Sequence, residues 1–270
     1  MSKVFANHAH VFEAAVKPNG TIDCLKQAMD MAGIDKAVCF APFVTGRGTQ
    51  MSSRDLDQNE WLAASIKGDP DLYGFGTVNF DAGDLRGQVE KIADLGFKGI
   101  KLHPAHQEFR VNGPKAYEVY RAAERLGLFL SFHTGVHYYR LSEYQMLLFD
   151  DLTFDFPDLK FSMEHMGGHC FFKDALAVMT NRRYNAKDPH IFAGWTSIYT
   201  KGNWHLSDEE LDDLVTIGGP LCQCYGLDFP YKKSEAFIDS IARVRGLNIP
   251  EETKDLILGG NLARELHIQL

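Results

Sequence analysis

Short apolar runs alternate with longer amphipathic stretches along the whole chain. Apolar runs bounded by turn residues are typical of buried strands. Eight such runs occur, at residues 3–10, 36–43, 72–79, 96–103, 128–135, 160–167, 191–198 and 221–228. The pattern therefore predicts eight strands, separated by segments long enough to form helices.

The stretches between the runs carry helix boundary signals. Pro114 opens the stretch 114–125, at a position where a helix does not use the backbone N–H. Ser207 begins the stretch 207–217 and is followed three residues later by Glu210, which is the capping-box pattern. Strands that alternate with helices indicate βαβ units and a parallel sheet.

Eight strand–helix units in one chain predict an α/β fold of the closed (β/α)₈ type, a TIM barrel of ~250 residues. A doubly wound open sheet usually needs a glycine-rich nucleotide loop after its first strand. Here the first run ends in Asn7-His8-Ala9-His10 instead. No linker or low-complexity tract divides the chain, so we predict one domain over residues 1–270. We expect the long spans 44–72 and 136–159 to lie over the barrel mouth or beside it.

Composition narrows the classes of protein. Hydrophobic residues make up 45% of the chain and charged residues 24%, which is typical of a globular protein and excludes a disordered chain or a disulfide scaffold. The 28 basic and 36 acidic residues give a net charge of −8. With no basic cluster, this charge argues against a nucleic-acid or anionic-membrane partner.

The cysteines and the N-terminus bear on location. Five cysteines cannot all pair with one another, and their spacing suggests no disulfide framework, which indicates a reducing compartment. The N-terminus lacks the apolar core of a signal peptide, and no run reaches the roughly 18 apolar residues that cross a bilayer. We therefore expect a cytoplasmic protein without a membrane segment.

Histidine and aspartate gather where the predicted strands end. Barrel enzymes carry their chemistry at the carboxyl ends of the strands. Five of the eight runs end on such residues, namely His8 with His10, His103, His133, His165 and Asp228. Alternation along a strand puts both His8 and His10 on one face. With His133 and Asp228 they offer three nitrogens and one carboxylate, a set that suits Zn²⁺ or another divalent ion.

The remaining histidines have a simpler interpretation. A single histidine near a strand end is usually a hydrogen-bonded structural residue or is exposed to solvent. We apply this interpretation to His190, His205 and His267. His106 and His137 are interpreted as loop histidines, with substrate contact as the alternative.

Several motifs together resemble the amidohydrolase superfamily, and more closely its amidohydrolase-related branch, the one that contains aminocarboxymuconate semialdehyde decarboxylase. They are His8-Ala9-His10, Gly96-Phe97-Lys98-Gly99-Ile100-Lys101-Leu102-His103-Pro104, His133, Glu164-His165-Met166-Gly167-Gly168, Gly226-Leu227-Asp228-Phe229-Pro230 and Ile257-Leu258-Gly259-Gly260-Asn261. The resemblance extends from residue 3 to about residue 268.

The resemblance implies roles for the residues at the strand ends. His8, His10, His133 and Asp228 are expected to bind a single divalent metal ion, with zinc favoured and manganese or another ion as the alternative. His165 is expected to orient or deprotonate the water bound there, and Asp228 to assist as a proton shuttle.

Two further residues near the strand ends bear on the resemblance, and one of them, Asn7, departs from the pattern of the superfamily. Lys101 stands where binuclear relatives carry a bridging carboxylated lysine, and we interpret it as a buried, paired cation. Asn7 replaces an acidic or small polar residue, and alternation predicts that it faces away from His8 and His10.

Polar residues after the strands are candidates for substrate binding. They are His103, Arg47, Arg110, Tyr138 and Arg140. Arginine matches a carboxylate with a two-pronged hydrogen bond, so these residues favour an anionic substrate.

Three functions compete on this evidence. The first is a metal-dependent hydrolase of an amide, lactone or related carbonyl bond in a small molecule. The second, with the same residues, is a nonoxidative decarboxylase of an aromatic or unsaturated acid. The length of 270 residues leaves little room for the large loops that such decarboxylases often add, which favours the hydrolase. The third and least favoured is a barrel that binds a metabolite without catalysis. A homodimer is an open alternative to a monomer.

Overall fold

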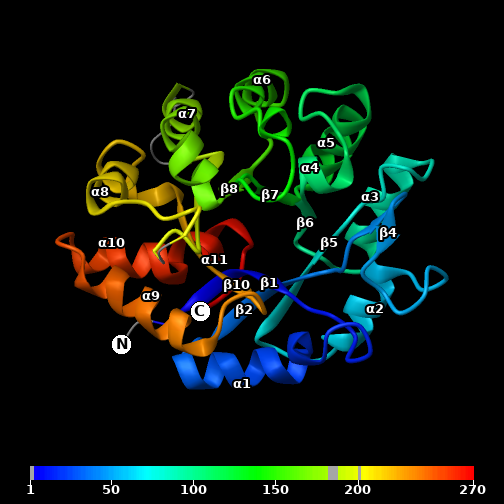
Figure 1. Ribbon diagram of the computed structural model, residues 1–270, viewed down its shortest axis with the longest axis horizontal. Helices are drawn as coiled ribbons and strands as arrows, with labels where there is room; N and C mark the ends of the chain where they lie inside the picture. The colour runs from blue at the N-terminus through cyan, green and yellow to red at the C-terminus, as the bar shows by residue number, and fades with distance from the viewer. Residues whose placement is uncertain (1–2, 182–187, 200–201) are drawn as a thin grey trace.

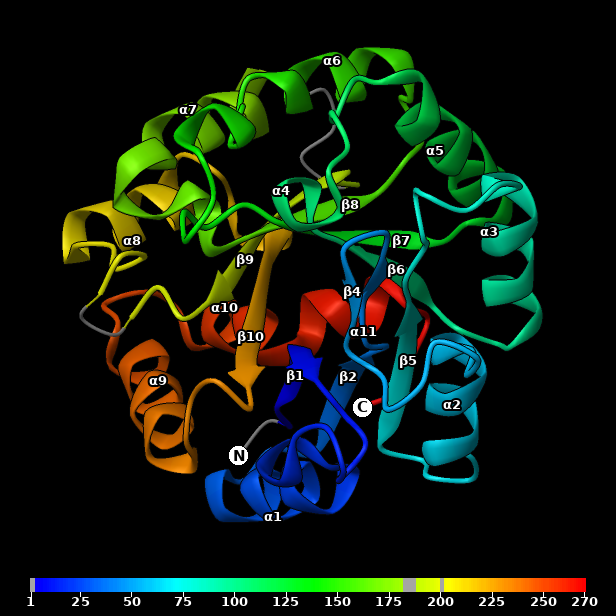
Figure 2. The ribbon, with the colours of Figure 1, turned by 45° about the vertical axis from the view of Figure 1, so that its right-hand side comes forward.

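The computed structural model describes residues 3–181, 188–199 and 202–270, and its strands form a closed parallel barrel ringed by helices (Figures 1 and 2). The order around the barrel is β1-β10-β9-β8-β7-β6-β5-β2. The barrel strands are β1 (Phe5–His10), β2 (Lys36–Phe40), β5 (Leu72–Gly76), β6 (Gly99–Leu102), β7 (Phe129–His133), β8 (Phe161–Glu164), β9 (Ile191–Thr196) and β10 (Gln223–Phe229). One barrel strand arises from each predicted run, which confirms the (β/α)₈ fold.

The helices surround the barrel, and one short helix lies at its mouth, where it contributes His106 to the cavity lining. They are α1 (Ile22–Ala32), α2 (Gln58–Ser65), α3 (Leu85–Asp94), α4 (Pro104–Gln107), α5 (Pro114–Leu126), α6 (Leu148–Asp155), α7 (Gly168–Asn181), α8 (Asp208–Thr216), α9 (Ser234–Gly246), α10 (Glu251–Asp255) and α11 (Asn261–Glu265). The two helix starts predicted from the sequence are both confirmed. Pro114 begins α5, and Ser207 and Glu210 form the reciprocal capping box of α8.

Aromatic side chains fill the interior. Rings of Phe40, Phe75, Phe129 and Phe192 contact one another in sequence, with centroids 5.8, 6.1 and 5.4 Å apart. All four side chains are buried, so the barrel is a packed core rather than a channel. The predicted site of histidine and aspartate residues must therefore lie above this aromatic layer, at the carboxyl ends of the strands.

The two long spans reach the mouth of the barrel. The span 44–72 contains the small antiparallel hairpin of β3 (Val44–Thr45) and β4 (Gly48–Thr49), followed by α2. Gln50 from this span, and His137, Tyr138 and Tyr139 from the other, line the cavity at the mouth. Within the described residues, no helix is long and apolar enough to cross a membrane.

Candidate active site

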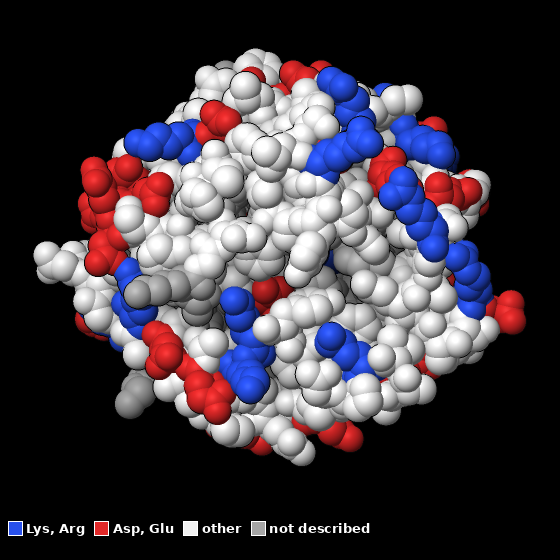
Figure 3. Space-filling view, viewed as in Figure 1, with Lys and Arg blue, Asp and Glu red and all other residues white. Residues whose placement is uncertain are grey.

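A cavity of about 680 Å³ opens at the carboxyl ends of the barrel strands. Its lining consists of His10, Phe43, Gln50, His103, His106, His133, His137, Tyr138, Tyr139, Asn203, Trp204, Asp228, Tyr231 and Lys232. Figure 3 shows this side of the molecule as largely uncharged around a central hollow, with an acidic group inside the hollow next to basic side chains. Polar groups thus converge inside a wall that is mostly aromatic and histidine.

Three predicted ligands meet at one point of the mouth. The Nε2 atoms of His8 and His10 lie 3.1 Å apart, and Nε2 of His8 lies 3.7 Å from Oδ1 of Asp228. One ligand atom from each of the three residues lies within 4.8 Å of the others. Two imidazoles and a carboxylate at these separations fit a divalent ion such as Zn²⁺ or Mn²⁺.

Local backbone irregularities bring the three residues together. His8 and Asp228 both have left-handed backbone conformations, with φ of 69° and 63°. The register of β1 shifts between Asn7 and Ala9 against β10 and between Ala6 and Ala9 against β2, as at a β-bulge. Strained conformations of this kind persist only where the surroundings enforce them, and they cluster at functional sites.

The bulge overturns the predicted orientation of Asn7. Strict alternation would turn its side chain away from His8, yet Nδ2 of Asn7 donates to Oε1 of Glu164 at 2.8 Å inside the barrel. His8 contacts the same carboxylate through Nδ1, at 3.1 Å from Oε2. Alternation fails here because the bulge adds a residue to β1 relative to β2, so neighbouring side chains face the same side.

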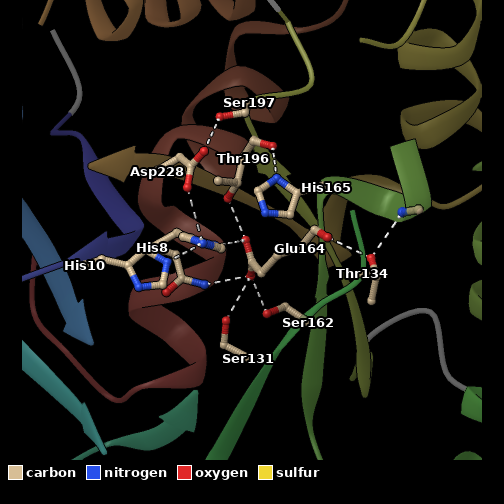
Figure 4. A network of polar contacts seen from close by, with 12 residues as sticks. His8, His10, Ser131, Thr134, Ser162, Glu164, His165, Thr196, Ser197 and Asp228 are labelled. Carbon is tan, nitrogen blue, oxygen red and sulfur yellow. Dashed lines mark hydrogen bonds and ion pairs between the residues drawn. The ribbon is translucent and has the colours of Figure 1, made fainter. Parts of the chain in front are cut away.

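Glu164 is the centre of a buried network that draws on four strands (Figure 4). Its carboxylate accepts hydrogen bonds from Asn7 and His8 on β1, Ser131 on β7, Ser162 on β8 and Thr196 on β9. Gly194 leaves room for it, since a Cβ at that position would lie 2.5 Å from the carboxylate. A buried carboxylate is stable only with such partners.

The network fixes the tautomer of His8. Glu164 offers acceptor oxygens, so Nδ1 of His8 carries the proton and Nε2 presents its lone pair to His10 and Asp228. Carboxylates that orient a ligating histidine in this way are typical of metal sites. Glu164 belongs to one of the motifs that resemble the superfamily, but the sequence alone does not predict its role. The available signal was a carboxylate inside an otherwise apolar run.

The tautomer of His165 is also fixed by a hydrogen bond at Nδ1, in this case to the backbone. Its Nδ1 donates to the backbone carbonyl of Thr196 at 2.7 Å, which leaves Nε2 unprotonated. Nε2 is buried and has no hydrogen-bond partner in the described part of the chain. The ring packs on Trp204 at a centroid distance of 4.0 Å, and it lies 5.0 Å from the ring of His8 and 4.7 Å from that of His133.

His133 lies with a different group of histidines. One nitrogen from each of His103, His133 and His137 falls within 4.8 Å of the others. Nε2 of His133 lies 2.7 Å from the carbonyl oxygen of Gly135 and 3.1 Å from Nδ1 of His137. The geometry therefore groups His8, His10 and Asp228 and sets His133 beside them. His137, interpreted from the sequence as a loop histidine, takes part in the cavity wall.

Burial governs the protonation of the site. It lowers the pKa of His8, His10, His133 and His165 well below 6.5, and the charge of Lys101 lowers them further. Burial raises the pKa of Asp228 to about 7, against the hydrogen bond from Ser197 and the charge of Lys101. The histidines are thus neutral near pH 7, which is the state that binds a metal or accepts a proton.

Lys101 lies inside the barrel below the mouth. Its side chain is fully buried, as predicted, and Nζ lies 4.9 Å from the ring centroid of Phe40. Nζ has no hydrogen-bond partner among the described residues, so the predicted pairing is limited to the longer-range attraction of Glu164 and Asp228. Burial lowers the pKa of Lys101 to about 7.

The predicted substrate-binding residues divide into two groups. His103 and Tyr138 line the cavity. Arg47 pairs with Glu108, Arg110 donates to Asn112 at 2.6 Å, and Arg140 is exposed, and none of these three lines the cavity. Among the described lining residues the cation is Lys232, which follows β10 and is not one of the predicted substrate-binding residues.

The comparisons with known proteins agree with this architecture. The amidohydrolase family model matches residues 23–267. Among solved structures, 5-carboxyvanillate decarboxylase from Sphingomonas paucimobilis is 17% identical with a TM-score of 0.70, and the match covers 100% of both chains. A probable 2-pyrone-4,6-dicarboxylic acid hydrolase from Acinetobacter baumannii, with citric acid bound, is 16% identical with a TM-score of 0.72, over 98% of this chain and 100% of that one.

A third similar structure contains a metal. It is a dihydroxybenzoic acid decarboxylase from Polaromonas sp. JS666 with bound manganese and the inhibitor 2-nitroresorcinol, 15% identical with a TM-score of 0.72, and the match covers 99% of this chain and 97% of that one. At these identities the structural likenesses establish the fold. They include both hydrolases and decarboxylases, so they leave the reaction open.

Proposed function

The chain belongs to the amidohydrolase family, and from this premise we propose that it is a metal-dependent hydrolase of a small anionic molecule. The bond cleaved is an amide, lactone or related carbonyl bond. One observation carries the proposal. The ligand atoms of His8, His10 and Asp228 converge on one point, and the unprotonated Nε2 of His165 lies beside this group.

The ligand group supports a single ion, for which zinc is our first candidate and manganese the second. When bound, the ion supplies Lewis-acid chemistry, lowering the pKa of a water molecule and polarising a carbonyl group. Glu164 keeps Nε2 of His8 free for this role by holding its Nδ1 proton. His133, the fourth ligand predicted from the sequence, donates its Nε2 proton to the carbonyl of Gly135, which leaves the lone pair on Nδ1. It lies outside the group of ligand atoms that His8, His10 and Asp228 form.

His165 is the proposed general base. Because its Nδ1 proton is bonded to Thr196, only Nε2 is free to take a proton from the attacking water. Asp228 is the proposed proton shuttle, which passes the proton taken up by His165 on to the leaving group. Trp204 packs on the ring of His165 and shields it from solvent on that side.

The anionic character of the substrate is supported by the cavity wall. Lys232 is the cation in the lining, and Asp228 is the only acidic residue that the described lining includes. None of the three predicted arginines lines the cavity, so the support comes from Lys232.

A decarboxylase remains the second candidate, because the cavity wall is rich in aromatic side chains. Phe43, Tyr139, Trp204 and Tyr231 all line it and would pack against the ring of an aromatic acid. Such a reaction would use the same ligand group, so the residues alone do not separate the two candidates.

An isotope experiment separates the two reactions. The metal-loaded protein is incubated in oxygen-18 water with a panel of lactones and amides of dicarboxylic acids, and in deuterium oxide with hydroxybenzoates. A hydrolase incorporates one oxygen-18 atom into the new carboxylate and releases no carbon dioxide. Release of carbon dioxide with deuterium on the ring carbon, and no oxygen-18 incorporation, would establish the decarboxylase instead.

A further inference from the structure

We propose that His103 forms a second recognition point in the cavity, where its Nε2–H donates a hydrogen bond to a carboxylate oxygen of a small organic acid. The inference rests on the proposed function and adds to it how the anionic end of the substrate is bound. His103 follows β6, which lies four strands from β10 around the barrel, so it stands across the mouth from Asp228.

The tautomer of His103 is fixed by the backbone. Nδ1 of His103 accepts the backbone N–H of His106 at 3.2 Å, as the cap of α4. A backbone N–H can only donate, so Nδ1 has no proton, and the neutral ring carries its proton on Nε2. His103 is therefore a donor toward the cavity in its resting state.

The position of His103 is also held rigidly. Its backbone N–H donates to Oε1 of Gln107 at 2.7 Å, and Nε2 of Gln107 donates to the carbonyl of Val78 at 2.8 Å. Pro104 begins α4 immediately after it, where its fixed φ is compatible with a helix. The short helix α4 thus fixes both the position of the His103 side chain and the nitrogen that carries its proton.

The surroundings strengthen a hydrogen bond from Nε2. The ring of His103 stacks on His133 with centroids 4.0 Å apart, and it lies edge-on to Phe43 and Tyr139 at 6.3 and 5.6 Å. The side chain is only 7% exposed, and the described residues provide no hydrogen-bond partner for Nε2. A donor in such a weakly solvated setting binds an anionic acceptor more strongly than one in water.

The same tautomer argues against a second metal ion at this place. His103, His133 and His137 are close enough to bind one. An ion at Nε2 of His103 would require loss of the Nε2 proton while Nδ1 continues to accept the N–H of His106, which would leave an imidazolate. An oxygen acceptor on a ligand needs no such change, so the group suits an anion.

Two substitutions separate the donor from the cap. In His103→Asn, the shorter side chain can still accept the N–H of His106 as a helix cap but cannot reach the position of Nε2. In His103→Gln, an amide N–H reaches that position, while the cap is weakened. Binding of benzoate, phthalate, succinate and citrate is measured by calorimetry for the wild type and both variants, with and without zinc.

We expect His103→Asn to weaken binding of the best of these probes by about 10- to 100-fold, the effect of one hydrogen bond to a charged group. His103→Gln should stay within a few-fold of the wild type. The loss should occur in the zinc-free protein too, which separates this proposal from the proposed metal-dependent reaction. If only zinc-loaded protein bound the probes, or if His103→Asn bound them as the wild type does, the proposal would be overturned.

Nitrogen-15 NMR of the histidine side chains gives an independent measurement. We expect the spectrum of His103 to show the proton on Nε2, with a shift on addition of the probe that binds best. A proton on Nδ1, or a wild type that binds none of the four acids, would overturn the proposal whatever the affinities of the variants.

Discussion

Oε2 of Glu164 lies 3.1 Å from Nδ1 of His8, in the fully buried interior of the barrel. Through this contact Glu164, which is not among the predicted metal ligands, decides which nitrogen of His8 faces His10 and Asp228. The contact gives Glu164 a positioning role in the proposed metal site, and this role can be tested apart from catalysis.

Glu164→Gln should weaken metal binding by about 10- to 100-fold, which is the usual effect of removing a partner that orients a ligating histidine. Competition with a chelator of known affinity measures the change. Ser131→Ala is the matched control, because it removes one donor to the same carboxylate, at 3.3 Å, and leaves the contact with His8. Equal metal affinity in Glu164→Gln and the wild type would contradict the assigned role.

Replacing His8 and His10 together by alanine should abolish stoichiometric metal, because two of the three convergent ligands are lost. His133→Ala should retain it, because His133 lies outside the group of ligand atoms that His8, His10 and Asp228 bring within 4.8 Å of one another. Elemental analysis of the purified proteins provides the measurement, with His267→Ala as a control outside the cavity lining. Loss of metal from His133→Ala would restore the four-ligand set predicted from the sequence.

His165→Asn should keep the metal and lower turnover by ~10²–10⁴-fold, the usual contribution of a positioned acid–base group. Asparagine can still donate to the carbonyl of Thr196 but cannot accept a proton. The assay uses the substrate identified by the isotope experiment, together with metal analysis. Near-normal turnover would exclude His165 as the base, and loss of metal would show that it is a ligand.

Lys101→Met should raise the free energy of unfolding near pH 7. The pKa of Lys101 is lowered from 10.5 to about 7 by burial. Between these pH values the unfolded chain binds a proton that the folded chain does not, so this lysine makes stability rise with pH by up to about 1.4 kcal/mol per pH unit. Urea unfolding at pH 7 and pH 9 measures the slope.

The methionine variant should lack that component of the pH dependence. Lys98→Met is the control, because Lys98 precedes the same strand and is exposed. If Lys101→Met and the wild type gave the same slope between pH 7 and pH 9, the folded-state pKa of Lys101 would not be lowered.

The fold was predictable because nearly every strand position is buried, so each strand reads as a mostly apolar run. The strand ends were predictable for the same reason, and they located His8, His10 and Asp228. Alternation, however, assumes a regular strand. The bulge at His8 breaks that assumption, and Asn7 turns inward to Glu164 as a result.

Other parts of the site depend on contacts between distant segments. Glu164 and Thr196 are 32 residues apart, and nothing in either segment alone indicates their hydrogen bond. Arg47 follows a strand and could have reached the cavity, but a pairing with Glu108 holds it on the surface. The partner of a loop side chain depends on the tertiary structure, so the spacing of residues in the sequence does not predict its role.

The pairing of β1 with β10, which closes the barrel, determines when the site can form during protein synthesis. His8 and His10 come from the first strand and Asp228 from the last, and these strands pair only when the ring closes. A growing chain displays both imidazoles long before the carboxylate emerges from the ribosome. The three groups can therefore assemble only after β10 has been made, so the step that closes the barrel also completes the site.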